Sequence, residues 1–334
     1  MNVIKRYVFV LTILVIPIFL QTGCAHKAEP VSQAGFYLDT VIQITLYDTG
    51  NRESCIDTIQ DCFALIDNYE HLFSASIEGS DIWNINHGGG KPVTVSEDTL
   101  SLLRAALYYS ELSDGMVDAT VLPLSRLWNF GSDASCRVPD QDSIEAALSH
   151  VDWRNVHIDG SAVTLKDPLA AIDPGFIAKG YIADRLKEYL LDRGVRSACI
   201  SLGGNLVTIN NKPDGTPYRI GIRKPFAPEG EIAATVTVTD SSVVSSGIYE
   251  RYFYEDGTLY HHLLDTRTGY PADNNIAGVT ILSPSSLEAD ALSTTCYFLG
   301  IDTGMELIES IDGTEALFIT KDGTLHYSKG FPHD

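Results

Sequence analysis

The chain has 334 residues and a formal net charge of −21, and 44% of its residues are apolar. That length allows two domains or one large one, and that apolar content is enough for a buried core. So negative a chain argues against nucleic acid as a partner, because it offers no basic face to a phosphate backbone. An anionic substrate would have to be bound through a metal ion or well-placed backbone amides.

The first residues have the layout of a bacterial secretory signal. A basic pair, Lys5 and Arg6, precedes an apolar run from Tyr7 to Leu20. That run is too short for a comfortable membrane-spanning helix. It fits the apolar core of a signal peptide, which would direct the rest of the chain out of the cytoplasm.

A cysteine follows the apolar run almost directly. Thr22-Gly23-Cys24 resembles a bacterial lipobox, in which the cysteine is lipidated and becomes the new N-terminus, although Gln21 replaces the usual Leu. We expect residues 1–23 to be a signal peptide, and residues 24–34 to be a lipidated cysteine with a polar tether. The protein would then lie on the extracytoplasmic side of the cell membrane. An uncleaved anchor or an ordinary signal peptide is the alternative.

Strand and helix patterns follow one another irregularly along the remaining chain. Alternation predicts strands, and apolar residues at helical spacing predict helices. The predicted strands and hairpins are Thr40–Leu46, Val156–Leu165, Ala198–Leu202, Leu206–Ile209, Tyr252–Leu264 and Ala316–Tyr327, and the predicted helices are Ile56–Tyr69, Leu100–Leu107, Ile177–Arg193 and Leu287–Leu299. This order predicts an α+β fold with mixed, largely antiparallel sheets, interspersed helices and two subdomains, and not a doubly wound sheet.

Four polar clusters carry the candidate chemistry. The first is Asp118-Ala119-Thr120, which the aromatic residues Trp128 and Phe130 follow. Polar groups and aromatic rings this close in sequence could read the edge of a base and cover its ring. A structured loop without a ligand is the simpler alternative.

The second cluster runs from Asp173 to Tyr181 and enters a helix. Its glycines would let backbone amides approach an anion, and a helix N-terminus favours negative charge. Lys179 could contact a phosphate. The cluster lacks the P-loop pattern and the full GxGxxG, and glycine-rich turns before helices are mostly structural.

The third cluster begins at His261-His262 and continues to Asp265. Histidine is the natural general base near neutral pH. The pair could instead bind zinc, but adjacent residues of a strand point to opposite faces. At most one of these two histidines therefore faces a given site.

The fourth cluster, Glu288 to Thr294, is predicted to be helical. Asp290 and Thr294 are four residues apart and lie on one helical face. A carboxylate and a hydroxyl suit Mg²⁺, which takes few protein ligands and leaves room for phosphates. The simpler alternative is an Asp that stabilises the helix dipole and a Thr that bonds its own backbone.

Together and in order, these clusters resemble the motifs of the ApbE-type flavin transferases. Residues 114–131 resemble DGxFDPTVxPLxxLWxFG, 173–184 resemble DLGGIAKGYAVD, 201–205 resemble NLGG, 246–253 resemble TSGDYERYF, 260–272 resemble YHHIIDPRTGYPA, 289–300 resemble ADALATAxFxLG, and 73–86 match FS…SEIxxIN. The likeness runs from about Phe36 to the C-terminal hairpin. It implies one flavin transferase domain over residues 35–330.

The resemblance also implies roles for individual residues. The family binds Mg²⁺ through a backbone carbonyl, here that of Ala178, and through an Asp and a Thr, here Asp290 and Thr294. Its candidate base corresponds to His262, with Asp265 next in line.

The same motifs imply where FAD would bind. The implied residues are Leu38, Thr40, Ser76, Asp118, Ala119, Thr120, Asp173, Lys179 and Leu264. The chain departs from the family pattern at three places. Leu38-Asp39-Thr40 stands for Met-Gly-Thr, Ser76 for an aromatic residue that covers a ring of FAD, and Pro174 for a Leu.

The resemblance therefore implies a Mg²⁺-dependent, lipid-anchored enzyme that transfers FMN from FAD to a Thr or Ser hydroxyl of a partner protein and releases AMP. The expected acceptor is a flavoprotein such as a subunit of a membrane redox complex. Two alternatives are an FAD pyrophosphatase that gives free FMN and AMP, and a non-catalytic FAD-binding lipoprotein. An intact His262 argues against the second alternative, because storage needs no base.

Overall fold

The computed structural model describes residues 29–332, apart from residues 49, 132–135 and 229. The predicted signal peptide and Cys24 lie outside the described residues. In the part that the structure describes, no helix combines the length and the apolar character needed to cross a membrane.

The helices begin where polar side chains can accept hydrogen bonds from their first amides. They are α1 (Arg52–Phe73), α2 (Asp81–Asn86), α3 (Glu97–Leu112), α4 (Leu122–Trp128), α5 (Gln141–Leu148), α6 (Ala178–Asp192) and α7 (Ser286–Glu309). Asn51, Ser96 and Ser285 each cap a helix in this way. Helices α4 and α6 differ, since their N-cap residues Val121 and Ile177 make no side-chain cap hydrogen bond.

One antiparallel sheet organises the molecule. The strands are β1 (Val31–Tyr37), β2 (Thr40–Leu46), β3 (Val93–Thr94), β4 (Val156–Asp159), β5 (Ala162–Leu165), β6 (Ala198–Leu202), β7 (Asn205–Ile209), β8 (Tyr218–Arg223), β9 (Ile232–Val238), β10 (Ser242–Gly247), β11 (Tyr252–Glu255), β12 (Thr258–His261), β13 (Ile276–Ser283), β14 (Glu315–Thr320) and β15 (Leu325–Tyr327). The eight-stranded sheet has the order β1-β2-β6-β7-β10-β13-β14-β15, and its neighbouring strands are antiparallel.

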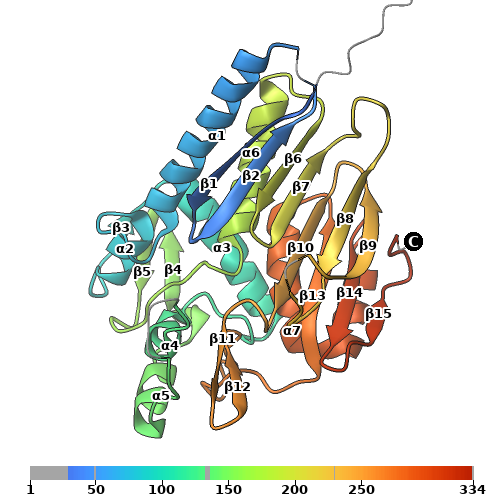
Figure 1. Ribbon diagram of the computed structural model, residues 1–334. Helices are drawn as coiled ribbons and strands as arrows, with labels where there is room; N and C mark the ends of the chain where they lie inside the picture. Colours follow the sequence, from blue (N-terminus) through green and yellow to red (C-terminus); the bar gives the residue numbers. More distant parts are fainter. Residues whose placement is uncertain (1–28, 49, 132–135, 229, 333–334) are drawn as a thin grey trace, which may run out of the picture.

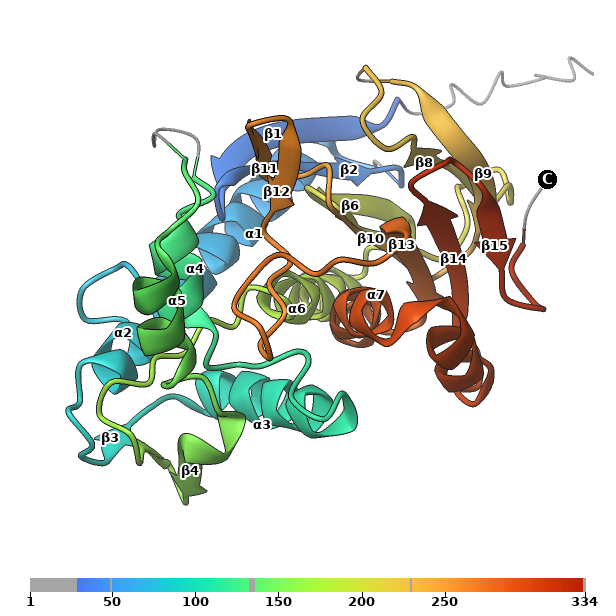
Figure 2. The same cartoon turned by 90° about the horizontal axis from the view of Figure 1, so that it is seen from below.

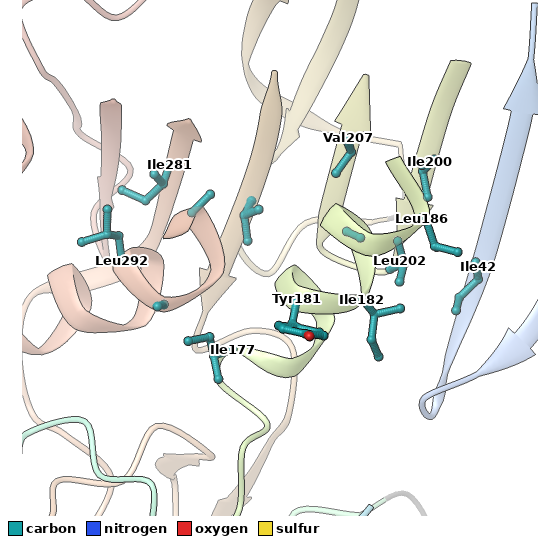
Figure 3. Packing of buried hydrophobic residues seen from close by; sticks show 14 of the residues in the cluster. Ile42, Ile177, Tyr181, Ile182, Leu186, Ile200, Leu202, Val207, Ile281 and Leu292 are labelled. Carbon is teal, nitrogen blue, oxygen red and sulfur yellow. The ribbon is translucent and has the colours of Figure 1, made fainter. Parts of the chain in front are cut away.

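Helices α1, α6 and α7 cover one face of this sheet (Figures 1 and 2). Figure 3 shows how the core forms between these layers. Ile182 and Leu186 of α6 pack with strand residues such as Ile200, and Leu292 of α7 packs with Ile281. The β8–β9 hairpin forms a second cluster, where Tyr218, Ile222, Val236 and Val238 meet Val243, Leu282, Leu317, Ile319 and Phe331.

Smaller elements lie beside the main sheet. The sheet β3-β5-β4 packs with α2 and α3. The β11–β12 hairpin places Phe253 and Tyr260 against Trp128 of α4. The first and the third polar clusters therefore lie on neighbouring elements, α4 with its preceding loop and the β11–β12 hairpin, near the lower end of Figure 1.

The predicted α+β class and the largely antiparallel sheets are confirmed. The predicted end of the Tyr252–Leu264 hairpin is wrong. Strand β12 ends at His261, not at Leu264, because the chain enters a turn that Asp265 and Gly269 close. The predicted helix end at Leu299 coincides with a break in α7, since Gly300 has a φ of 82°, an angle that glycine adopts readily, and a further helical segment then runs to Glu309.

Helices α6 and α7 approach unusually closely at Gly180. A Cβ atom there would lie 2.7 Å from both the Cβ of Asp290 and the Cα of Leu287, and it would also collide with the carbonyl oxygen of Ser286. Two of these three atoms are backbone and cannot rotate away. The sequence KG at the start of α6 therefore permits the contact between the two helices.

We expect Gly180→Ala to destabilise the protein by about 1–3 kcal/mol, the usual effect of overpacking. The loss should appear although Ala is the better helix former by about 1 kcal/mol. Urea unfolding of the variant and the wild type measures the difference. Gly50→Ala is the matched control, since no atom lies within 4 Å of its added Cβ, and a loss no larger than that of the control would contradict the packing argument.

Candidate functional site

The close contact of α6 and α7 joins the three predicted metal ligands. The backbone N–H of Gly180 donates to Oδ2 of Asp290 at 2.8 Å. Ala178 is the first residue of α6, two positions before Gly180. Thr294 stands one turn beyond Asp290, and its hydroxyl lies 3.3 Å from Oγ of Ser246. The structure therefore brings these ligands together from segments far apart in the chain.

Asp290 is a buried carboxylate with only 4% of its surface exposed. Burial raises its pKa, while the charge of Lys179, the N–H of Gly180 and the side-chain amide of Asn205 oppose that rise. Each of these groups favours the ionised form, which a metal ligand must have. The groups around Asp290 thus favour its charged carboxylate, whereas burial disfavours that charge.

Two further charged groups face the same region. Lys179 is half-buried and interacts with Glu250, Asp290 and His262. Within the described residues it makes no ion pair as close as 4 Å. Glu250 keeps an exposed surface, but the atoms packed around its carboxylate raise its pKa, and Lys179 and Arg251 oppose the rise. A cation without a close ion pair can accept an anion.

His262 follows strand β12 and turns toward this charged region. Its backbone N–H donates to the carbonyl oxygen of Arg251 at 3.1 Å, and its Nδ1 lies 3.3 Å from the same oxygen. A carbonyl can only accept, so Nδ1 carries the proton and Nε2 keeps a free lone pair. Burial, together with the charges of Arg251 and Lys179, lowers the pKa of His262 to about 3. The ring is therefore neutral at physiological pH.

His261 points the other way, as expected for its neighbour on a strand. It is 3% exposed, its Nε2 lies 3.2 Å from the carbonyl oxygen of Ala272, and its ring contacts Tyr297 of α7. Burial lowers its pKa to about 4. His261 is a core residue, and it cannot join His262 in a shared metal site.

Asp265 and Leu264 have structural partners. Both carboxylate oxygens of Asp265 accept hydrogen bonds from the Arg267 guanidinium, at 3.0 and 2.8 Å, which lowers the pKa of Asp265. So paired a carboxylate is a weak base. Leu264 is buried with Leu124, Trp128 and Ile144. The structure thus places these two residues in the turn that supports His262.

The first and second polar clusters meet through backbone contacts. The amide of Asp173 donates to the carbonyl oxygen of Ala119 at 2.8 Å. The carboxylate of buried Asp118 accepts from the amide and hydroxyl of Thr120, both at 2.7 Å, and from the amide of Trp153 at 2.9 Å. The Asp118 and Thr120 side chains therefore shape this loop.

The remaining predicted FAD residues lie in loops or, in the case of Thr40, at the start of β2. Leu38 and Asp39 form the β1–β2 turn with φ values of 53° and 56°. Glycine suits such angles, and Asp tolerates them better than most residues. Thr40 touches Gly203, since a Cβ on that glycine would lie 2.8 Å from Oγ1 of Thr40. Ser76 is exposed in the loop after α1.

The donor set fits a hard divalent cation. In the described part of the chain, no cluster of three or more His, Cys, Asp or Glu side chains could hold a metal ion. Asp290, Thr294 and the Ala178 carbonyl instead offer three oxygen donors, and Mg²⁺ commonly keeps several waters or phosphate oxygens besides few protein ligands. The Nδ2 of Asn205, which faces the same carboxylate, is buried without a hydrogen-bond partner.

Sequence reasoning did not single out Asn205, Glu250 or Arg251. Each lay inside a recognised motif, yet none had a spacing that pointed to chemistry. Their roles depend on contacts with α6 and with His262 that form across long stretches of chain. The glycine pair before Asn205 was the one local signal of a backbone held close to another group.

Comparison with known proteins gives consistent matches. The model of the ApbE family matches residues 38–318. A relative from Klebsiella pneumoniae (strain 342), named FAD:protein FMN transferase, is 38% identical over 262 residues, covering 78% of this chain and 81% of the relative. A relative of the same name from Treponema pallidum (strain Nichols) is 33% identical over 324 residues, covering 92% of this chain and 89% of the relative.

Solved structures agree with these matches. The ApbE protein of Thermotoga maritima superposes with a TM-score of 0.82 at 31% identity, covering 90% of this chain and 97% of the other. The flavin transferase ApbE of Vibrio cholerae superposes with a TM-score of 0.81 at 27% identity, covering 91% of this chain and 98% of the other. The chain therefore shares the fold of these proteins over nearly their whole length.

The buried His261 predicts how stability depends on pH. The pKa of His261 in the folded protein is about 4, below the usual 6.5. The unfolded chain therefore binds a proton at this residue more readily, so its contribution to the free energy of unfolding is complete above pH 6.5 and is lost as the pH falls toward 4. We expect this residue to account for a loss of about 2 kcal/mol between pH 7.5 and 5.0. Urea unfolding at both pH values should show that loss in the wild type and a smaller loss in His261→Gln.

His157 is exposed and supplies the control. His157→Gln should lose as much stability as the wild type between the two pH values. An equal loss in His261→Gln would contradict the assignment of the acid sensitivity to His261.

Proposed function

The chain belongs to the ApbE family, and we propose that this transferase moves the FMN half of FAD onto a hydroxyl group of an acceptor protein. The finer features of the proposal are dependence on Mg²⁺, a Thr or Ser as the acceptor and AMP as the product. One observation carries it. The hydrogen bond from Gly180 to Asp290 gathers oxygen ligands, a cation and a neutral histidine in one place.

Three oxygen donors would hold the metal: the carbonyl of Ala178, the carboxylate of Asp290 and the hydroxyl of Thr294. Bound Mg²⁺ neutralises negative charge on a diphosphate as the bond between its phosphates breaks. Lys179 adds a fixed positive charge beside Asp290. The metal ion and Lys179 would offset the repulsion between a chain of net charge −21 and an anionic substrate.

His262 would act as the general base. Its Nδ1–H is directed at the Arg251 carbonyl, so Nε2 is free to accept the proton of an acceptor hydroxyl. The hydroxyl oxygen forms a bond to the FMN-side phosphorus, the bond from that phosphorus to the bridging oxygen breaks, and AMP leaves with the electron pair. Diphosphate charge beside Lys179 and Arg251 would offset the two cations that lower the pKa of His262 and so make it a stronger base.

A location at the membrane would suit this reaction. The apolar run and Cys24 support a lipid anchor on the extracytoplasmic side. Flavin-carrying subunits of membrane redox complexes would then be within reach as acceptors. This part of the proposal depends on sequence alone.

The direct test is incubation of the protein with FAD, Mg²⁺ and a purified candidate flavoprotein subunit. In-gel flavin fluorescence of the acceptor and release of AMP are the expected results. Free FMN with AMP and an unlabelled acceptor would favour the pyrophosphatase alternative. Binding of FAD without AMP release would favour a carrier.

In this assay, Asp290→Ala should abolish Mg²⁺-dependent transfer while the protein remains folded. The variant loses one of few protein ligands, and no other described carboxylate is held by Gly180. Circular dichroism checks the fold. Asp302→Ala, an exposed change on the same helix, should leave transfer unchanged, and Mg²⁺-dependent AMP release by folded Asp290→Ala would overturn the metal assignment.

His262→Asn separates a catalyst from a carrier. The variant keeps a hydrogen-bonding group but cannot accept a proton near neutral pH. FAD and Mg²⁺ should still bind, whereas FMN transfer should fall by about 10²–10⁴-fold, the usual effect of losing general acid–base catalysis. Unchanged transfer would place the base elsewhere, and a loss of FAD affinity would make His262 a binding residue.

A further inference from the structure

Asn205 combines two properties that rarely occur together in a folded protein. Its side chain is 1% exposed, and its Nδ2 has no hydrogen-bond partner in the described part of the chain. A buried donor that lost its bonds to water and gained no other normally destabilises the fold. Such groups are few, and each one needs an explanation.

The sheet fixes Asn205 at the edge of the proposed metal site. It begins β7 directly after the Gly203-Gly204 turn and pairs with Leu202 on β6 and Val244 on β10. Two residues beyond Val244, the hydroxyl of Ser246 reaches Thr294. A Cβ on Gly204 would lie 2.9 Å from the carbonyl oxygen of Ser245, so the turn is pressed against β10. The backbone of Asn205 cannot leave this position without disturbing three strands.

The group that the amide faces is the carboxylate of Asp290. The amide lies near enough to favour the charged form of that carboxylate, but Nδ2 does not reach hydrogen-bond geometry. Meanwhile Gly180 already holds Oδ2 of Asp290 from the α6 side. Asn205 therefore approaches the carboxylate from the sheet, and Gly180 approaches it from the helix.

We propose that Asn205 is a positioning residue of the metal site, whose amide and the N–H of Gly180 together hold the Asp290 carboxylate in the orientation that a divalent cation needs. This inference depends on the proposed function, because it takes Asp290 to be a metal ligand. Partners of this kind behind a ligand commonly change metal affinity by 10–100-fold. The Asn205 amide, which has no partner in the metal-free protein, would then orient the Asp290 carboxylate when a cation is bound.

The test uses Asn205→Leu in the full-length protein and MgCl₂ alone as the probe. Leucine is similar in size and branching but has no donor. We expect the Kd for Mg²⁺, measured by calorimetry, to rise about 10-fold. The Tm of the metal-free variant should equal or exceed that of the wild type, because an unpaired buried donor has been removed. A merely structural asparagine would give the opposite result, a lower Tm with an unchanged Kd.

Ser242 offers a matched control on the neighbouring strand β10. It is fully buried and its hydroxyl also lacks a partner, but it pairs with Val207, away from the metal ligands. Ser242→Ala should therefore leave the Kd for Mg²⁺ unchanged. Asn205→Ala is the second variant, and it should weaken Mg²⁺ binding in the same way as Asn205→Leu.

Three results would overturn the inference. They are a Kd for Mg²⁺ within about twofold of the wild type, weaker FAD binding with unchanged Mg²⁺ binding, and a large fall in the metal-free Tm of both Asn205 variants. Asp290→Ala, measured in the same experiment, separates this failure from that of the proposed function. Loss of Mg²⁺ binding there, with normal binding in Asn205→Leu, would reject only the role of Asn205.

Discussion

The contact between α6 and α7 at Gly180 is the constraint on which the candidate site depends. Only glycine fits at this position, because a Cβ added to it would lie 2.7 Å from both the Cβ of Asp290 and the Cα of Leu287. That proximity allows the Gly180 N–H to reach the Asp290 carboxylate. Lys179 and Ala178 are carried to the same place because they precede Gly180 directly. A packing requirement in the core thus produces the arrangement of polar groups at its edge.

Electrostatics explains how so acidic a chain can present a site for an anion. The negative charge of −21 belongs to the whole sequence, whereas Lys179 and Arg251 gather near His262 and Glu250. Burial and these two cations keep His262 neutral, and Lys179 offsets the burial of the nearby carboxylates of Glu250 and Asp290. Long-range repulsion is screened within about 10 Å in ordinary salt, so these near charges dominate the electrostatic field that a ligand meets at the site.

Local patterns predicted the elements but not how they meet. Alternation located β2 to the residue, and the spacing of Asp290 and Thr294 placed both on one helical face. The bond from Gly180 to Asp290 joins residues 110 positions apart, and no local pattern contains that information. Likewise, the sequence could not show that Asp265 is paired with Arg267, or that Asp118 is satisfied by Thr120 and Trp153. Those outcomes depend on turns whose geometry forms only with the tertiary structure.

The polar groups at and beside this site make its packing less stable than a packing of apolar side chains would be. Asp290 is ionisable and buried, His261 and His262 are held neutral by burial, and Asn205 has a donor without a partner. Each of these disfavours the folded state relative to an apolar side chain of similar size. Asp290 and Asn205 lie where α6, α7 and β7 meet, His261 and His262 lie at and just after the end of β12, and the stability of the large apolar cluster offsets these unfavourable groups. The same cluster fixes their positions, so the core that offsets the unfavourable burial also holds the groups ready for a metal ion and a diphosphate.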